Sequence, residues 1–410
     1  MKIFHLRTQQ SRCDLLNHFY FLLLLIVHVV ILTVMINEIS IYYKEAILLQ
    51  KDASVAAWMA NFFIDVFGHN DFALRLPFLI LHIINVTLLY LISLKVVRRK
   101  EDALLVVFIY MLIPGVNIIA LLVSKSSIIL LITLLIVFLK LYFKHISYVL
   151  FIVITFLDSS GAVLLLSLFF YGLIFKNVKI LIFSIIFFGA NMYIFSPIRG
   201  VPEAYFLDTL GLFAMLLSPL LFIYYCYCVY DSVLNKASLL NLIPFVGIIF
   251  ILLLSTRQEI DIESFFPPIL VGLPLVVVKI LSSIRLRLKV YARAYTLRLV
   301  VILVVAFLST ALLLGNKITY LFSSEPNFAY SFYEAKEIAH DLKAMGITHI
   351  QVYSKTLRER LKFYGISDGD KYKLEPFYSR KNKTFENAIV IKYLGRVIHV
   401  YEVDPIKSHP

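Results

Sequence analysis

The chain has 410 residues, of which 60% are hydrophobic and only 16% are charged, and its mean hydropathy is +0.87. This composition excludes a soluble globular protein and is typical of a polytopic membrane protein. The formal net charge of +13 does not indicate nucleic-acid binding, because most Lys and Arg lie in short loops between apolar segments, where they set topology. Cys226 and Cys228 lie inside an apolar segment, so neither a disulfide framework nor a zinc site is indicated.

Eleven apolar segments predict membrane-spanning helices, for which about 20 apolar residues suffice, or somewhat fewer where the membrane thins. We expect them at 19–35, 76–94, 103–122, 127–143, 146–157, 162–175, 180–195, 209–230, 239–255, 265–281 and 299–315. Lys and Arg gather in the loops on one side, which predicts a cytoplasmic N-terminus and a C-terminus outside the cytoplasm. The first segment is too long for a signal-peptide core and no small-residue cleavage site follows it, so we expect it to be retained.

Residues 151–172 admit two interpretations: one helix interrupted by polar residues, or two short helices joined by a turn at Asp158-Ser159-Ser160-Gly161. A single helix would move the five Lys and Arg residues of 285–298 to the outer side, against the charge rule. We therefore expect two short helices with the turn on the outer side.

The pattern changes at about residue 316, which predicts a transmembrane domain over 1–315 and an α/β domain outside the cytoplasm over 316–410. Residues 332–346 have helical spacing with Gly346 as a stop. A strand is expected at 347–354 and a second short helix at 356–365. Residues 387–403 alternate about Leu394-Gly395 and predict a β-hairpin. The fold class is thus a polytopic α-helical membrane protein with a small C-terminal α/β domain.

The first outer loop, residues 36–75, is long for a compact membrane protein and carries many polar side chains. Loops of this length are usually functional or contain interfacial helices. Residues 54–77 favour a helix lying along the membrane surface, which either serves a function or merely seals the bundle.

Glu38 follows the first predicted helix at the depth of the lipid headgroups. A carboxylate at this position can also lack a function and simply mark the solvated end of a helix. Three cations, Arg75, Lys125 and Arg257, are expected on the same face. Such a set suits a lipid phosphate held by the cations while the carboxylate acts as base toward a hydroxyl or an amine. Each cation taken alone is more often an interfacial residue whose charge reaches the headgroups.

Asp158 is the second candidate acid, although Asp is favoured at a helix–helix turn for turn chemistry alone. Glu259, Asp261 and Glu263 form a small acidic group that would bind a divalent cation or an acceptor amine. A spacing of two is not a recognised metal motif, so no metal ligands are assigned.

The order of these features resembles the GT-C membrane glycosyltransferases, which include the protein O-mannosyltransferases and the aminoarabinose transferases of lipid A. In that family an acidic pair follows the first helix, and a segment ending in ALRLP opens the second. The matching residues here are Asn37-Glu38 and VFGHNDFALRLPFLI at 66–80. Residues 124–142 and 264–274 resemble later family segments, so that the resemblance covers roughly 15–280. Asn37 stands where the family usually has Asp, and Ser126 where its outer turn often has Asp.

The resemblance implies transfer of a sugar from a polyprenyl-phosphate-linked donor to a lipid, glycan or protein acceptor on the periplasmic face of a bacterial inner membrane. Glu38 carries over best as the catalytic acid, with Asp158 as a second candidate. Arg75, Lys125 and Arg257 would hold the donor phosphate. The substrate-binding candidates are Asn37, Tyr42, Tyr43, Glu259 and Glu263.

A different class of function is a non-catalytic binder or a transporter of lipid-linked sugars. Transporters often contain internal repeats and helices broken at mid-membrane. The sequence shows no repeat, and its polar residues fall at the outer rim, which favours the enzyme. Membrane lipids are the other expected partners, and nucleic acid is not.

Overall fold

A computed structural model describes residues 2–51, 54–195, 204–322, 325–327, 329–377 and 388–405. Contacts divide the chain into two compact units. We call residues 1–32, 78–120 and 124–310 the helical unit, and residues 33–77, 121–123 and 311–410 the second unit. The units group residues by contact and not by side of the membrane, so the domain boundary at 315/316 stays a prediction.

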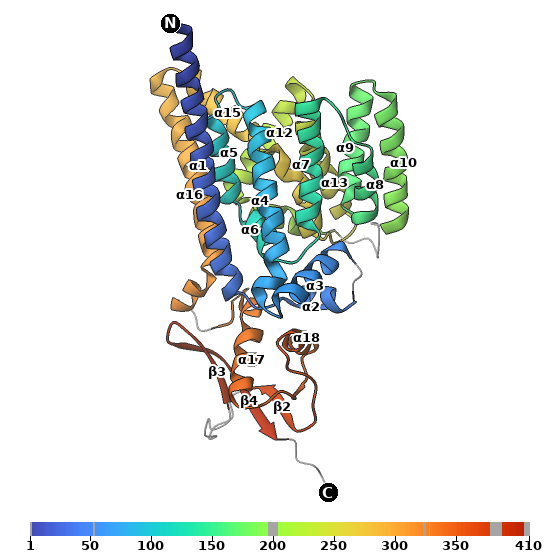
Figure 1. Cartoon of the computed structure of the whole chain (residues 1–410), viewed down its shortest axis with the longest axis vertical. Coiled ribbons are helices and arrows are strands. Elements are labelled where there is room, and N and C mark those ends of the chain that lie inside the picture. Colours follow the sequence, from blue (N-terminus) through green and yellow to red (C-terminus); the bar gives the residue numbers. More distant parts are fainter. Residues whose placement is uncertain are drawn as a thin grey trace. The chain divides into compact units, whose positions relative to one another are not determined.

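Helices make up almost the whole chain as far as residue 314 (Figure 1). In chain order they are α1 (Lys2–Glu38), α2 (Tyr43–Lys51), α3 (Val55–Phe67), α4 (Asp71–Val96), α5 (Asp102–Met111), α6 (Pro114–Leu121), α7 (Ser126–Phe143), α8 (Val149–Leu157), α9 (Gly161–Ile174), α10 (Val178–Phe195), α11 (Phe206–Leu217), α12 (Pro219–Asn235), α13 (Leu239–Ser255), α14 (Ile262–Phe265), the 3₁₀ helix η1 (Pro267–Gly272), α15 (Leu273–Arg285) and α16 (Lys289–Leu314).

All of the predicted apolar segments are helical, but they differ in length and continuity. In the described part of the chain, six helices are long and apolar enough to cross a membrane, or up to eight if each of two bent pairs is one span. The pairs α5–α6 and α11–α12 bend by 66° and 101°. Pro114 and Pro219 begin the second helix of each pair, where proline is tolerated, and proline inside one continuous helix would break its hydrogen bonding.

The remaining predicted spans correspond to the short helices α8, α9 and α13. The expectation of two helices within 151–172 is confirmed, since α8 ends at Leu157 and α9 begins at Gly161. Asp158 is the C-cap of α8, and its carboxylate accepts the backbone N–H of Ser160 at 3.1 Å.

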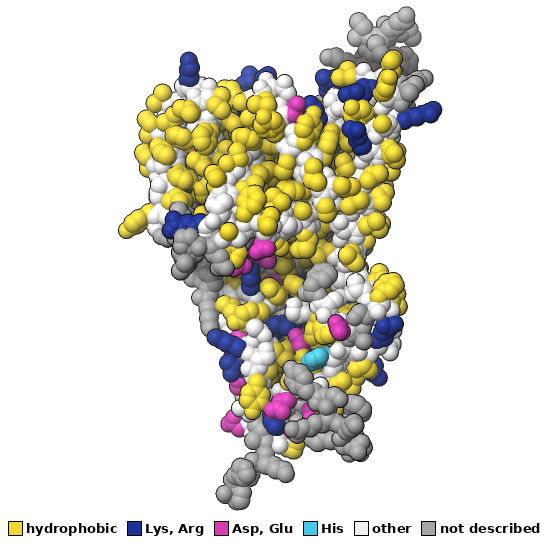
Figure 2. Space-filling model, turned by 180° about the vertical axis from the view of Figure 1, so that it is seen from behind, with side chains coloured by type: hydrophobic (Ala, Val, Ile, Leu, Met, Phe, Trp, Pro, Cys, Tyr) yellow, Lys and Arg dark blue, Asp and Glu magenta, His cyan; other side chains and the backbone are white. Residues whose placement is uncertain are grey.

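Burial separates central helices from peripheral ones. The most apolar windows of α1, α10 and α16 are only 22%, 17% and 17% buried, whereas that of 262–285 is 72% buried. Helices that are apolar all round yet little buried fit contact with lipid chains. Figure 2 shows the corresponding surface covered by hydrophobic side chains. The helical unit is therefore a membrane-spanning bundle.

Gly172 lets α9 and α10 approach closely, because a Cβ placed there would lie 2.8 Å from the backbone nitrogen of Leu181. We expect Gly172→Ala to destabilise the protein by about 1–3 kcal/mol, since backbone atoms cannot move aside as a flexible side chain can. Gly189→Ala in α10 is the matched control, because a Cβ there meets nothing within 4 Å. Thermal unfolding in detergent checks this prediction, and equal midpoints for the two variants would contradict it.

The second unit holds the predicted α/β elements. They are the 3₁₀ helices η2 (Asn316–Leu321) and η3 (Tyr330–Phe332), the helices α17 (Glu334–Ala344) and α18 (Lys355–Phe363), and the strands β1 (Gln351–Val352), β2 (Tyr372–Pro376), β3 (Ala388–Tyr393) and β4 (Arg396–Pro405). The sheet order is β1-β2-β4-β3, with β1 parallel to β2 and the other pairs antiparallel.

Both tail helices and the hairpin are confirmed. Leu394 and Gly395, with φ of 50° and 80°, form the turn between β3 and β4. The strand predicted over 347–354 is only two residues long, and β2 was not predicted.

The single helix predicted over 54–77 is wrong. α3 ends at Phe67, and Gly68 adopts φ +87°, a conformation that favours glycine. The side chain of Asn70 then accepts the backbone N–H of Ala73 at 2.7 Å and so caps the start of α4. The ALRLP segment consequently lies in the first turns of α4, with Pro77 inside that helix.

Candidate functional site

The chain that leaves α1 is held by the C-terminal part of the second unit. The Lys336 ammonium donates to the carbonyl of Asn37 at 2.7 Å and pairs with the Asp71 carboxylate at 2.7 Å. Two residues after Glu38, the backbone N–H of Ser40 donates to the carbonyl of Phe332 at 2.7 Å. Residues far apart in sequence thus fix the backbone on both sides of Glu38.

Glu38 itself presents its carboxylate to solvent, with 52% of its side chain exposed. Lys317 Nζ donates to Glu38 Oε2 at 2.8 Å. The same ammonium lies over the rings of Tyr333 and Tyr393, at 4.6 and 5.2 Å from their centroids. These cation–π contacts help to hold the ammonium in place beside the carboxylate. The result is an accessible acid with a positioned cation beside it.

A second carboxyl, that of Glu337, lies in the same region. Burial raises the pKa of Glu337, although the nearby Lys317 ammonium opposes the shift. Asn316 donates to the Tyr333 hydroxyl at 2.8 Å, and burial raises the pKa of Tyr333. The Tyr333 hydroxyl therefore stays protonated at neutral pH.

Arg75 has no exposed side-chain surface. Its guanidinium donates to the carbonyls of Ile39 and Ser40 at 2.8 and 2.9 Å and to Glu45 Oε2 at 2.9 Å. The Glu45 carboxylate also accepts the backbone N–H groups of Tyr42, at 2.8 Å, and of Val123, at 2.7 Å. Arg75 is thus placed in a buried network that orients the loop after Glu38, and Glu45 is a residue that sequence reasoning missed.

Arg360 makes a second buried connection to the same loop. Its side chain is 4% exposed and donates to the carbonyl of Ile41 at 3.0 Å and to Ser40 Oγ at 3.2 Å. It also donates to the carbonyl of Ser331 and pairs with Glu334 at 3.1 Å.

Tyr364 completes this connection. Its hydroxyl donates to Asp71 Oδ1 at 2.7 Å and accepts the N–H of Ile41 at 2.8 Å. Burial raises the pKa of Tyr364, which keeps the hydroxyl protonated and able to donate.

The two tyrosines predicted to contact substrate have different surroundings. The Tyr42 ring stacks on Phe332, with centroids 4.6 Å apart and planes 20° apart. Tyr43 is the first residue of α2 and is half-buried. Tyr42 therefore packs against the C-terminal part of the second unit through its ring.

The helical unit brings two other predicted residues together. Lys125, the N-cap of α7, lies 3.9 Å from Asp158 Oδ1. Asn191 of α10 donates to the Asp158 carbonyl at 2.9 Å, which fixes the turn between α8 and α9. Ser126 Oγ donates to the carbonyl of Glu263 at 2.7 Å. Lys125, Asp158 and the start of α14 thus form one polar group.

Within the described part of the chain, no contact joins Arg257 or Glu259 to that group. Both are exposed and lie in the turn that follows α13. Glu263 is half-buried in α14. Among the described residues, no three His, Cys, Asp or Glu side chains lie close enough together to hold a metal ion.

The chain, with its membrane-spanning bundle and its mixed second unit, is similar in fold to a solved structure. The similar solved structure is the crystal structure of ArnT from Cupriavidus metallidurans in the apo state. The TM-score is 0.52 at 9% sequence identity, and the match covers 86% of this chain and 85% of that chain. No family model and no curated protein sequence matches the chain.

The comparison confirms the resemblance drawn from ALRLP and its neighbours at the level of the fold. The sequence singled out Glu38, Lys125 and Asp158 as candidates, but it did not single out Lys317, Lys336 or Arg360. No local spacing connects these three residues with 37–41, because their hydrogen bonds to Glu38, Asn37 and Ile41 span 279, 299 and 319 residues of sequence.

Proposed function

We propose that this multi-pass membrane protein is a glycosyltransferase that moves a sugar from a polyprenyl-phosphate-linked donor to a lipid, glycan or protein acceptor. The observation that carries the proposal is the exposed, positioned carboxylate of Glu38 in a GT-C fold. The charges of the loops support a cytoplasmic N-terminus with Glu38 on the periplasmic face. A composition rich in Lys, Ile and Phe supports a bacterial inner membrane.

Glu38 is the general base in this proposal. Its carboxylate accepts the proton of the acceptor hydroxyl or amine as that group attacks the anomeric carbon of the donor sugar. The bond from that carbon to the phosphate oxygen breaks, and the polyprenyl phosphate leaves with the electron pair. A cation beside the leaving phosphate stabilises the charge that develops there.

The candidate cation is Lys317, which lies beside Glu38. Lys125 and Arg257, expected from the sequence to hold the donor phosphate, stay predictions. Arg75 is reassigned, because its guanidinium is buried and donates to two carbonyls of the loop that follows Glu38, to one carbonyl of α1 and to the Glu45 carboxylate of α2. We give Arg75 a positioning role, and Tyr42 the same role through its contact with Phe332. Asp158 remains a second candidate acid, next to Lys125.

The test is transfer of radiolabelled sugar from total polyprenyl-linked donors to endogenous lipids and proteins in membranes. Glu38→Gln keeps the shape of the side chain and removes the base, so we expect transfer to fall by about 10²–10⁴-fold. Asp65→Asn, an exposed acid of α3, is the matched control and should retain activity.

Two results would contradict the proposed base. Glu38→Gln membranes that transfer as well as the control would remove Glu38 from the chemistry. Absence of transfer in every sample, with donor lipid co-purifying with the wild-type chain, would favour the non-catalytic binder of lipid-linked sugars.

A further inference from the structure

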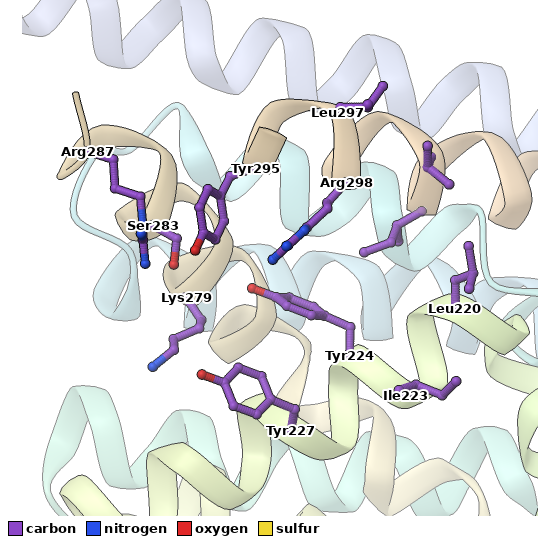
Figure 3. Close-up of a pocket in the computed structure, with 12 residues that line it drawn as sticks. Leu220, Ile223, Tyr224, Tyr227, Lys279, Ser283, Arg287, Tyr295, Leu297 and Arg298 are labelled. Atoms are coloured by element: carbon purple, nitrogen blue, oxygen red, sulfur yellow. The ribbon is translucent and has the colours of Figure 1, made fainter. Parts of the chain in front are cut away.

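A cavity of about 700 Å³ lies within the helical unit, between α12, α15 and the first half of α16 (Figure 3). None of the residues proposed for sugar transfer lines it. At one end of the cavity lie the polar ends of Arg287, Tyr295 and Arg298, and at the other end lie Leu220 and Ile223. The cavity therefore has a cationic part and an apolar part.

The cationic part has two charges without a carboxylate partner among the described residues. Arg287 and Arg298 both lie against the ring of Tyr295, at 4.3 and 4.9 Å from its centroid. Both guanidiniums line the cavity and carry the same charge, so an anion bound at this end of the cavity is attracted by both. Planar guanidiniums also suit the paired oxygens of a phosphate.

Two other cations near the cavity, Lys279 and Arg285, are paired with carboxylates. Lys279, which also lines the cavity, pairs with Asp231 at 2.6 Å and lies over the Tyr227 ring at 5.5 Å. Arg285 makes two hydrogen bonds to the carboxylate of Asp102, at 2.6 and 2.5 Å. The contrast marks Arg287 and Arg298 as the pair whose charge is available to a ligand.

The apolar part fits hydrocarbon. The apolar lining consists of Leu220 and Ile223 of α12 and of Leu297, Val301 and Ile302 of α16. Ile223 and Leu297 are 68% and 63% exposed, so this apolar lining is open to the surface of the bundle. An occupant with an anionic head and an apolar chain satisfies both parts, whereas a free anion would leave this surface uncovered.

We propose that this cavity binds the phosphate headgroup of an anionic phospholipid, with Arg287 and Arg298 holding the phosphate and an acyl chain lying along α12 and α16. The charges of the loops predict that this end of the helices faces the cytoplasm, where basic pockets between helices attract anionic lipids. The site is separate from sugar transfer and does not depend on that proposed function.

Native mass spectrometry of the full chain in detergent, with added phosphatidylglycerol, tests the proposal. We expect discrete lipid adducts that Arg287→Gln/Arg298→Gln reduces at least fivefold. The control Lys236→Gln/Arg293→Gln removes the same net charge from two exposed residues that do not line the cavity, and it should keep its adducts within twofold of wild type. Each single variant, Arg287→Gln or Arg298→Gln, should lose part of the binding.

Three outcomes would overturn the proposal. The first is equal adduct formation by the double variant and its control. The second is equal binding of phosphatidylcholine, which has the same chains without the net negative charge. The third is displacement of the lipid by inorganic phosphate at equal concentration, which would show that the cavity recognises a free anion. Equal thermal unfolding midpoints of the two double variants exclude misfolding as the cause of a loss.

Discussion

Replacing Arg75 by Met lowers the free energy of unfolding by about 3–5 kcal/mol, the cost of breaking a buried ion pair from one side. The substitution leaves the Glu45 carboxylate, which is 2% exposed, without its cation and frees the carbonyls of Ile39 and Ser40. Burying an uncompensated charge is costly because little solvent reaches it. Denaturant unfolding of the purified protein measures the change.

The double variant Arg75→Met/Glu45→Met separates the ion pair from its surroundings. Because both charges are removed together, we expect it to be more stable than Arg75→Met alone. Amide exchange gives a local readout, since the N–H groups of Tyr42 and Val123 both donate to Glu45. Unchanged exchange at these two amides in Arg75→Met would show that the network does not position the loop.

Arg360→Met is the second substitution with a large expected effect, of about 3 kcal/mol in unfolding free energy, because four acceptors lose a buried charged donor. The local consequence is release of residues 40–41 from the C-terminal part of the second unit. We expect faster amide exchange at Ser40 and Ile41, whose N–H groups donate to Phe332 and Tyr364. Sugar transfer should fall as well, since Glu38 precedes the released segment.

Arg358→Met is the matched control for Arg360. Arg358 stands on the same helix, is 38% exposed and lies 3.9 Å from Asp368, a distance typical of a weak surface pair. Its loss should change stability by less than about 1 kcal/mol. If the two variants unfold alike, Arg360 has no special role in holding the loop.

The apolar helices of the bundle could be predicted from sequence because a membrane demands long apolar segments. The break within 209–230 was not predicted, although Pro219 is visible in the sequence and proline ends or kinks a helix. The sequence does not show the positive φ of Ser218, +74°, that accompanies the bend. The helix over 54–77 failed for a similar reason, because Gly68 ends one helix and Asn70 caps the next.

Glu38 was singled out as a candidate because an acid at the end of a helix is visible in the local sequence. Arg75 was singled out because it lies in the ALRLP segment. The contacts that each of these residues makes could not be predicted from the local sequence. Arg75 was expected to hold a phosphate, and it is instead paired with Glu45, a residue that nothing in the local pattern distinguishes from other loop acids. Lys317 lies in the part of the chain that looked like a separate domain, and its contact with Glu38 spans 279 residues.

The span of that contact has a consequence for biogenesis. The second unit is assembled from residues 33–77 and 311–410, so its first part waits while the ribosome makes more than half of the protein. Closing so long a loop is slow and entropically costly. The Glu38–Lys317 pair is therefore completed only after the intervening helices have been made. A chain whose synthesis stops before residue 317 contains the helices of the bundle but lacks Lys317. In such an incomplete chain the Glu38 carboxylate has no Lys317 partner.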